Sequence, residues 1–161
     1  MDAWSNFFVG ELGAAAAFAG LLFVSISVNL KRILELGPLA DRGLEALIML
    51  FLTVTVASLG LLPGQPLRAF GGETLAVALV ALAIVLRLQH NYLAHVEAQY
   101  RKRWRQMAWV NAFAVFVIVA SGLLVAATGE LAGLYLLPIG VLLSFFAAGT
   151  NSWVLLIEIN R

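Results

Sequence analysis

The sequence predicts an all-α, polytopic membrane protein, a bundle of five transmembrane helices that forms a single transmembrane domain over residues 1–161. The first observation is composition: 62% of the residues are hydrophobic and 12% are charged, whereas soluble domains are about half apolar and a quarter charged. A soluble domain of this size could not bury so much apolar surface, so we expect lipid to cover it. The second observation is that the apolar residues form five runs separated by polar segments.

The five expected spans are about 8–30, 44–62, 74–92, 107–127 and 131–157. Most of these runs reach the ~20 residues that a helix needs to cross a hydrocarbon core. The third is long enough only if its helix continues past Arg87 to about Tyr92. Pro138 and Gly140 predict a kink in the fifth span.

Breaker residues mark the connections between the spans. Gly37-Pro38 stops the helical pattern after the first span, and Asp41 is a candidate N-cap for the second. The segment 63–66, Pro-Gly-Gln-Pro, is a turn signal, and Thr128-Gly129-Glu130 is a short connection.

Basic residues predict the orientation. The segments after the first and third spans contain Lys31, Arg32, Arg42, Arg101, Lys102, Arg103 and Arg105, the chain ends at Arg161, and Arg68 alone falls on the opposite side. Because cytoplasmic loops are enriched in Lys and Arg, we expect the N-terminus outside and the C-terminus in the cytoplasm. Arg outnumbers Lys eight to two, which favours a bacterial cell (inner) membrane.

The basic residues Arg101, Lys102, Arg103 and Arg105 are interleaved with Tyr100 and Trp104. Each positive charge near an anionic membrane surface contributes ~1 kcal/mol. We therefore expect these four residues to contact anionic lipid headgroups, and we expect no nucleic-acid partner.

Polar residues are concentrated in the third of the expected bundle that lies nearest the cytoplasm. An ionisable residue inside a membrane indicates a functional site or a structural contact. We call them the predicted inner cluster: Glu45, Arg87, His90, Asn91, Asn111, Asn151 and Glu158. Arg87, with Glu45 or Glu158 as its expected counter-charge, is the deepest basic residue. The alternative is that Arg87 extends to the interface and that the Asn residues join helices through hydrogen bonds.

The first span contains a stripe at helical spacing. We call it the first-span stripe: Glu11, Phe18, Leu22, Ser25 and Asn29, together with Ala15 and Arg32. Around a symmetric homo-oligomer it would place an acidic ring outside, an apolar constriction in the middle and polar groups inside. The alternative is an ordinary helix with polar ends, whose small residues (Gly13, Ala14, Ala16, Ala17, Gly20) pack closely against another helix.

Several kinds of chemistry are not expected. The chain has no cysteine, which excludes disulfides and thiolate sites. His90 and His95 are five residues apart, so they point about 140° apart on a helix and suit no common metal. The sequence contains no GxSxG motif and no glycine-rich phosphate loop. We therefore expect neither a metal, nor a cofactor, nor enzymatic activity.

The sequence supports two main hypotheses for the function. The first is a homo-oligomeric membrane protein that forms an ion or small-solute pathway, with the first helix near the pore. The second is a non-catalytic accessory or regulatory subunit that binds another membrane protein through its small-residue faces. A membrane enzyme using Arg87, His90 and Glu158 is a distant third.

Overall fold

The computed structural model describes residues 2–35 and 37–157, and no β-strand occurs among them. Its long helices are α1 (Ser5–Val28), α3 (Pro38–Gly60), α4 (Leu67–His95), α5 (Ala98–Thr128) and α6 (Leu136–Ile157). Short elements are the 3-10 turns η1 (Asp2–Trp4) and η2 (Leu131–Tyr135) and the helix α2 (Leu30–Glu35). Five segments are long and apolar enough to cross a membrane, which confirms the predicted all-α bundle of five membrane-spanning helices.

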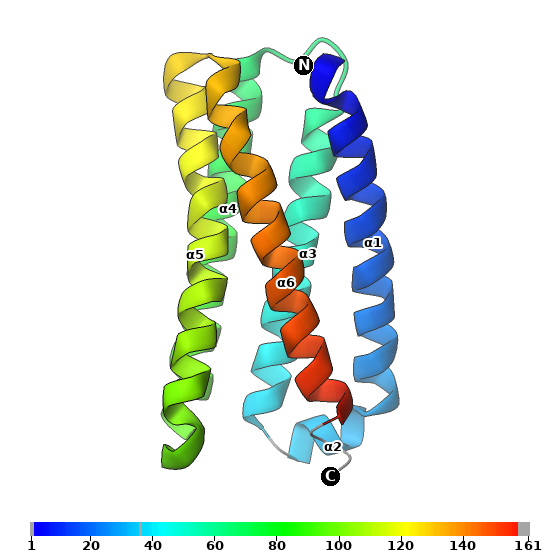
Figure 1. The fold of residues 1–161 in the computed structure, drawn as a ribbon, viewed down its shortest axis with the longest axis vertical. Helices are drawn as coiled ribbons and strands as arrows, with labels where there is room; N and C mark the ends of the chain where they lie inside the picture. Colours follow the sequence, from blue (N-terminus) through cyan, green and yellow to red (C-terminus); the bar gives the residue numbers. More distant parts are fainter. Residues whose placement is uncertain (1, 36, 158–161) are drawn as a thin grey trace.

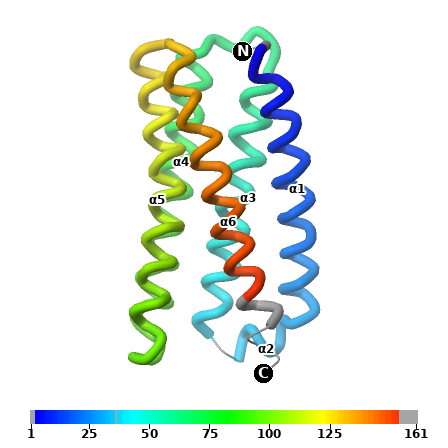
Figure 2. Tube along the Cα trace, in the orientation of Figure 1, coloured from blue at the N-terminus to red at the C-terminus, as the bar shows by residue number. Residues whose placement is uncertain are grey.

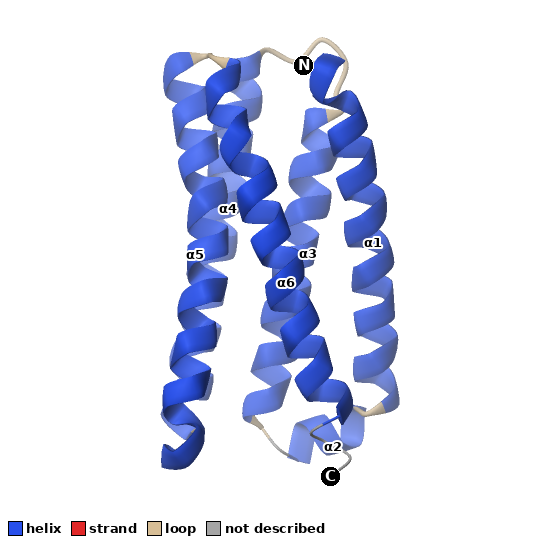
Figure 3. Ribbon diagram, viewed as in Figure 1, coloured by secondary structure: helices blue, strands red, loops and turns tan. Residues whose placement is uncertain are grey.

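The helices alternate in direction, and Figure 3 shows that only short loops join them. The N-terminus, the α3–α4 loop and the α5–η2 connection lie at one end of the bundle, which we call the N-terminal end (Figure 1). The helix α2, the α4–α5 turn and the end of α6 lie at the opposite end, which we call the α2 end (Figure 1). Of the described basic residues, Arg68 alone lies at the N-terminal end, while the others lie toward the α2 end.

The helix α3 lies at the centre of the packing, because it contacts α1, α4 and α6. The helices α4 and α5 form an antiparallel hairpin, and α6 crosses obliquely between α5 and α1 (Figure 2). The main apolar core joins side chains such as Phe8, Val56, Phe70, Ile118 and Leu137. This arrangement leaves α1 at the edge of the bundle, in contact with α3 and α6.

Two glycines allow the backbones of α4 and α5 to approach each other closely. A Cβ atom added to Gly122 would lie 2.6 Å from the backbone nitrogen of Leu75 and 3.1 Å from the carbonyl oxygen of Gly71. A larger residue at Gly122 would therefore push the hairpin apart, as at other close helix crossings in membranes.

The ends of the helices differ from the sequence prediction in three places. The expected loop after the first span is largely helical: α2 covers Leu30–Glu35, and α3 begins at Pro38. Proline is favoured in a first turn, where its missing N–H costs no hydrogen bond. Asp41 consequently lies inside the first turn of α3, and Gly37 is the N-cap residue in its place.

The other two differences concern α5 and α6. The helix α5 begins at Ala98, so Arg101, Lys102, Arg103 and Arg105 lie on its first two turns and not in a loop. Pro138 lies in the first turn of α6, directly after η2. The expected kink is therefore a change from 3-10 to α-helix between Tyr135 and Leu136, at a place where proline is tolerated.

Candidate functional site: a buried polar cluster

Six polar side chains from four helices meet inside the bundle toward the α2 end. We call them the buried polar cluster: Arg42 and Glu45 from α3, Gln89 and Tyr92 from α4, Asn111 from α5 and Asn151 from α6. Glu45 is 0% exposed and Arg42 is 3% exposed, which is unusual for ionisable residues. Because polar groups removed from water must find partners inside the protein, their contacts decide whether this cluster is stable.

The carboxylate of Glu45 lies at the centre of the hydrogen bonding. The Nε2 atom of Gln89 donates to Oε1 of Glu45 at 2.7 Å, and the hydroxyl of Tyr92 donates to Oε2 at 3.2 Å. The same Gln89 nitrogen also donates to the carbonyl oxygen of Ala108 at 2.9 Å. Glu45 and Gln89 thereby connect α3 to α4, and α4 to α5.

Arg42 makes the connection to α6. Its guanidinium donates to Oδ1 of Asn151 at 2.6 Å and contacts the sulfur of Met107 at 3.4 Å. Its Cζ atom also lies 4.6 Å from the ring centroid of Trp104, a cation–π distance. The ring of Trp104 in turn meets Tyr92 edge-on, with ring centroids 5.8 Å apart, so Arg42 and Glu45 belong to one connected network.

Two amide groups in this cluster have unused donors. Among the described residues, the Nδ2 atoms of Asn111 and Asn151 have no hydrogen-bond partner, although both side chains are buried. Asn111 lies beside the carboxylate of Glu45. The cluster therefore combines one carboxylate, one guanidinium of opposite charge and two buried amide groups.

Three members of the predicted inner cluster are in the buried polar cluster: Glu45, Asn111 and Asn151. Arg87, His90 and Asn91 are exposed on the opposite face of α4. Glu158 lies outside the described residues. The expected pairing of Arg87 with Glu45 is wrong, because the side chains that reach Glu45 from α4 are Gln89 and Tyr92.

Sequence reasoning missed Arg42, Gln89 and Tyr92. A signal was present for the last two, since Gln89 and Tyr92 continue the apolar stripe of α4 that includes Val85 and Leu88, all four of them buried. Residues three and four apart share a helix face. Polar residues on an apolar stripe point toward the interior, whereas Arg87 lies outside that stripe.

The first-span stripe is the packing face of α1 within this chain. Ala15 and Leu22 are buried, and the ring of Phe18 lies 6.4 Å from that of Phe145 on α6. Asn29 donates to the carbonyl of its own helix at Ser25. The glycines of α1 point the other way, since a Cβ added at Gly10, Gly13 or Gly20 would meet nothing within 4 Å.

Glu11 lies in the half of α1 near the N-terminal end. It is half-buried, and its Oε2 atom has no partner among the described residues. It lines a cavity of about 10 Å³, enough for one water molecule, together with Phe7, Phe8, Thr53, Val56, Ala57, Leu137 and Val141. A carboxylate oxygen therefore faces a small space between α1, α3 and α6.

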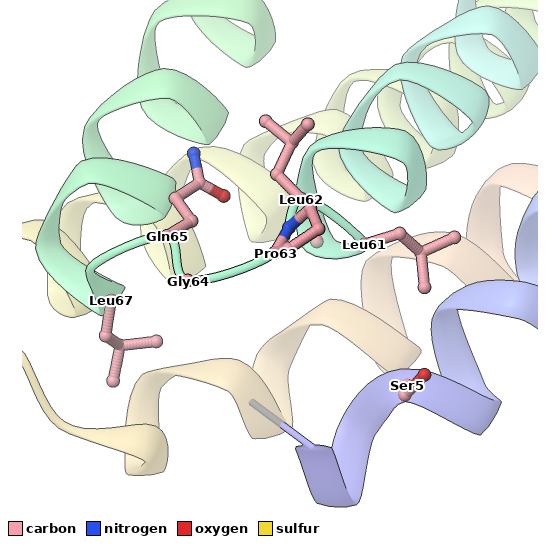
Figure 4. Close-up of a pocket in the computed structure, with 8 residues that line it drawn as sticks. Ser5, Leu61, Leu62, Pro63, Gly64, Gln65 and Leu67 are labelled. Carbon is pink, nitrogen blue, oxygen red and sulfur yellow. The ribbon is translucent and has the colours of Figure 1, made fainter.

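A larger hollow of about 520 Å³ opens at the N-terminal end. Figure 4 shows Ser5 of α1 across from the α3–α4 loop, which lines the hollow from Leu61 to Gln65, and Leu67 at the start of α4 also lines it. Gly60 also lines this hollow, and a Cβ atom added at that glycine would lie 2.7 Å from the ring of Phe8. Phe8 thus packs against Gly60 of this hollow and also lines the Glu11 cavity.

The remaining predicted residues lie at the surface. Arg101, Lys102, Arg103 and Arg105 are exposed on α5. His90 and His95 are also exposed, and within the described chain no group of His, Asp and Glu has a geometry suited to a metal ion.

Comparisons with family models, with curated proteins and with solved structures found no match for this chain. The fold and the sites above define a multi-pass helical membrane protein.

Proposed function

We propose that this protein provides a pathway for ions or small polar solutes through its own five-helix bundle. The observation that carries the proposal is Glu45, a fully buried ionisable residue in a membrane-spanning helix. Such residues are costly to insert, and they commonly belong to ion pathways and proton relays. Protons are the simplest cargo, because a carboxylate surrounded by amide and phenol donors can exchange one without a wide opening.

The proposed pathway runs between α1, α3 and α6. It would begin at the larger hollow at the N-terminal end, pass Phe8, and reach Glu11 and Thr53 at the small cavity. Thr53 and Glu45 are eight residues apart on α3, or ~12 Å along the helix. The buried Met49 lies between them in sequence, so passage would require α1 or α6 to move relative to α3.

The proposed pathway lies near the first helix, as in the hypothesis drawn from the sequence. It differs from that hypothesis because it is formed within one chain and not around the axis of an oligomer. The first-span stripe packs on α3 and α6, which favours a pathway inside each chain over one shared around a symmetry axis. We also propose a bacterial inner membrane location with the N-terminus outside, on the strength of the basic residues at the α2 end. A homo-oligomer would bring copies together through the small-residue face of α1.

The test is proton and cation flux into liposomes that contain the purified chain. We expect Glu45→Gln to lower flux at least tenfold and Glu11→Gln to lower it or change its cation selectivity, since each variant removes a charge and keeps the shape. Glu130→Gln, an exposed acid outside the helices, is the matched control and should leave flux unchanged. Unchanged flux in both Glu45→Gln and Glu11→Gln would remove the proposal.

The second candidate is a non-catalytic accessory subunit that binds another membrane protein. The exposed glycines of α1 favour it, because small residues let membrane helices approach closely. Its test is cross-linking in native membranes: Gly13→Leu should abolish a cross-link to the partner without unfolding the bundle. Recovery of the protein alone, before and after substitution, would count against this candidate.

A further inference from the structure

We propose that the outward face of α5 binds one anionic phospholipid at the α2 end of the bundle. We call this surface the α5 lipid face: Lys102, Arg105, Trp109, Phe113 and Phe116, all of them exposed. Trp109 is 72% exposed, and Phe113 and Phe116 are 56% and 55% exposed. Three large aromatic side chains in one row are thus turned away from the protein core.

The spacing places these residues on one side of the helix. Successive members are three, four, four and three residues apart, which are the intervals that keep side chains on one face. The first and last members of the row are fourteen positions apart, or ~21 Å along the helix. It is long enough to contact a phosphate and the upper part of an acyl chain of the same lipid molecule.

The order of residue types follows the layers of a membrane. Lys102 and Arg105 lie on the first two turns of α5, Trp109 follows at the start of the apolar run, and the two phenylalanines lie deeper. Tryptophan is enriched at the level of the headgroups, and basic side chains attract anionic headgroups from outside that level. The aromatic side chains would then contact the acyl chain.

Lys102 and Arg105 differ from the other two basic residues nearby. Arg101 donates to the carbonyl oxygen of Val96 at 3.4 Å. Arg103 is one residue after Lys102 on α5, so it points about 100° away from Lys102 around the helix. In the described part of the chain, neither Lys102 nor Arg105 has a carboxylate within salt-bridge distance. Both charges are therefore available to a phosphodiester, and charge complementarity favours a lipid with a net negative charge over a zwitterionic one.

The first test is native mass spectrometry of the full chain in detergent, titrated with phosphatidylglycerol or phosphatidylcholine. We expect one preferentially bound phosphatidylglycerol, and we expect Lys102→Gln/Arg105→Gln to weaken its binding roughly thirtyfold, as the loss of two charges of ~1 kcal/mol each near a headgroup implies. The matched control is Lys31→Gln/Arg32→Gln, which removes two exposed charges from α2 at the same end of the bundle. Equal weakening in both double variants, or equal binding of the two lipids, would overturn the proposal.

The second test locates the lipid on α5. Phosphatidylglycerol with brominated acyl chains should quench tryptophan fluorescence more than brominated phosphatidylcholine does, and Trp109→Phe should remove the difference. Soluble glycerol phosphate should not compete, because the aromatic row adds the contact with the acyl chain. A difference in quenching between the two lipids that persists in Trp109→Phe would contradict the proposed position, since exposed Trp153 is quenched by either lipid in both proteins. Neither test depends on ion flux, so the lipid site stands or falls separately from the proposed transport function.

Discussion

The two faces of α4 near the α2 end differ in whether their polar side chains are buried and hydrogen-bonded to other helices. On the inward face, Gln89 and Tyr92 donate hydrogen bonds to the buried carboxylate of Glu45. On the outward face, Arg87, His90 and Asn91 are exposed at the same depth. The contrast teaches that depth in a membrane does not assign a role to a polar residue, because only the inward groups must be satisfied by other parts of the protein.

The largest effect is expected at the centre of the inward face. Glu45→Ala should lower the free energy of unfolding by roughly 3–5 kcal/mol, because it leaves the buried donors of Gln89 and Tyr92 without their acceptor and removes the negative charge near Arg42. Arg87→Ala, on the outward face, should change it by no more than ~0.5 kcal/mol. Unfolding in mixed micelles, followed by circular dichroism, measures both. A similar loss for the two variants would erase the distinction between the faces.

An intermediate effect is expected for Gln89→Leu. The change removes the donor to Glu45 and to the carbonyl of Ala108, so two buried acceptors lose a partner at a cost of about 1–3 kcal/mol. Asn91→Leu is the matched control on the outward face, and it should be nearly neutral in the same unfolding experiment. If Asn91→Leu proved the more damaging change, the assignment of the two faces would be reversed.

The smallest effect is expected for Tyr92→Phe, which removes one hydroxyl and preserves the ring contact with Trp104. Loss of the 3.2 Å hydrogen bond to Glu45 should cost about 0.5–1.5 kcal/mol. Tyr100→Phe makes the same chemical change at an exposed position of α5 and should cost nothing measurable. Equal stabilities for the two variants would mean that the phenol does not contribute to the buried polar cluster.

The structural role of a glycine also depends on the helix face on which it lies. Gly71 and Gly122 allow α4 and α5 to touch, whereas Gly10, Gly13 and Gly20 of α1 point to open space around the chain. The sequence predicts close packing for the small residues of the first span, and it makes no such prediction for Gly71 or Gly122. Only the packed bundle separates the glycines that are used within one chain from those available to lipid or to another protein.

The sequence by itself determined the class of protein, the five membrane-spanning helices and the order in which they follow one another. These properties depend on hydropathy and on breaker residues, which act over stretches of about twenty residues along one helix axis. The same information grouped Glu45, Asn111 and Asn151 toward one end of the bundle, and the structure brings them together near the α2 end.

The tertiary structure alone decided which side chains meet. Gln89 reaches Glu45 across 44 positions of sequence, and Arg42 reaches Asn151 across 109. Such contacts depend on how each helix is rotated about its own axis, and a change of two residues turns a side chain by about 200°. Because that rotation is set by packing between helices far apart in the chain, the partners of Arg42 and Gln89 could not be read from local pattern, although the apolar stripe of α4 indicates that Gln89 points inward and Arg87 does not.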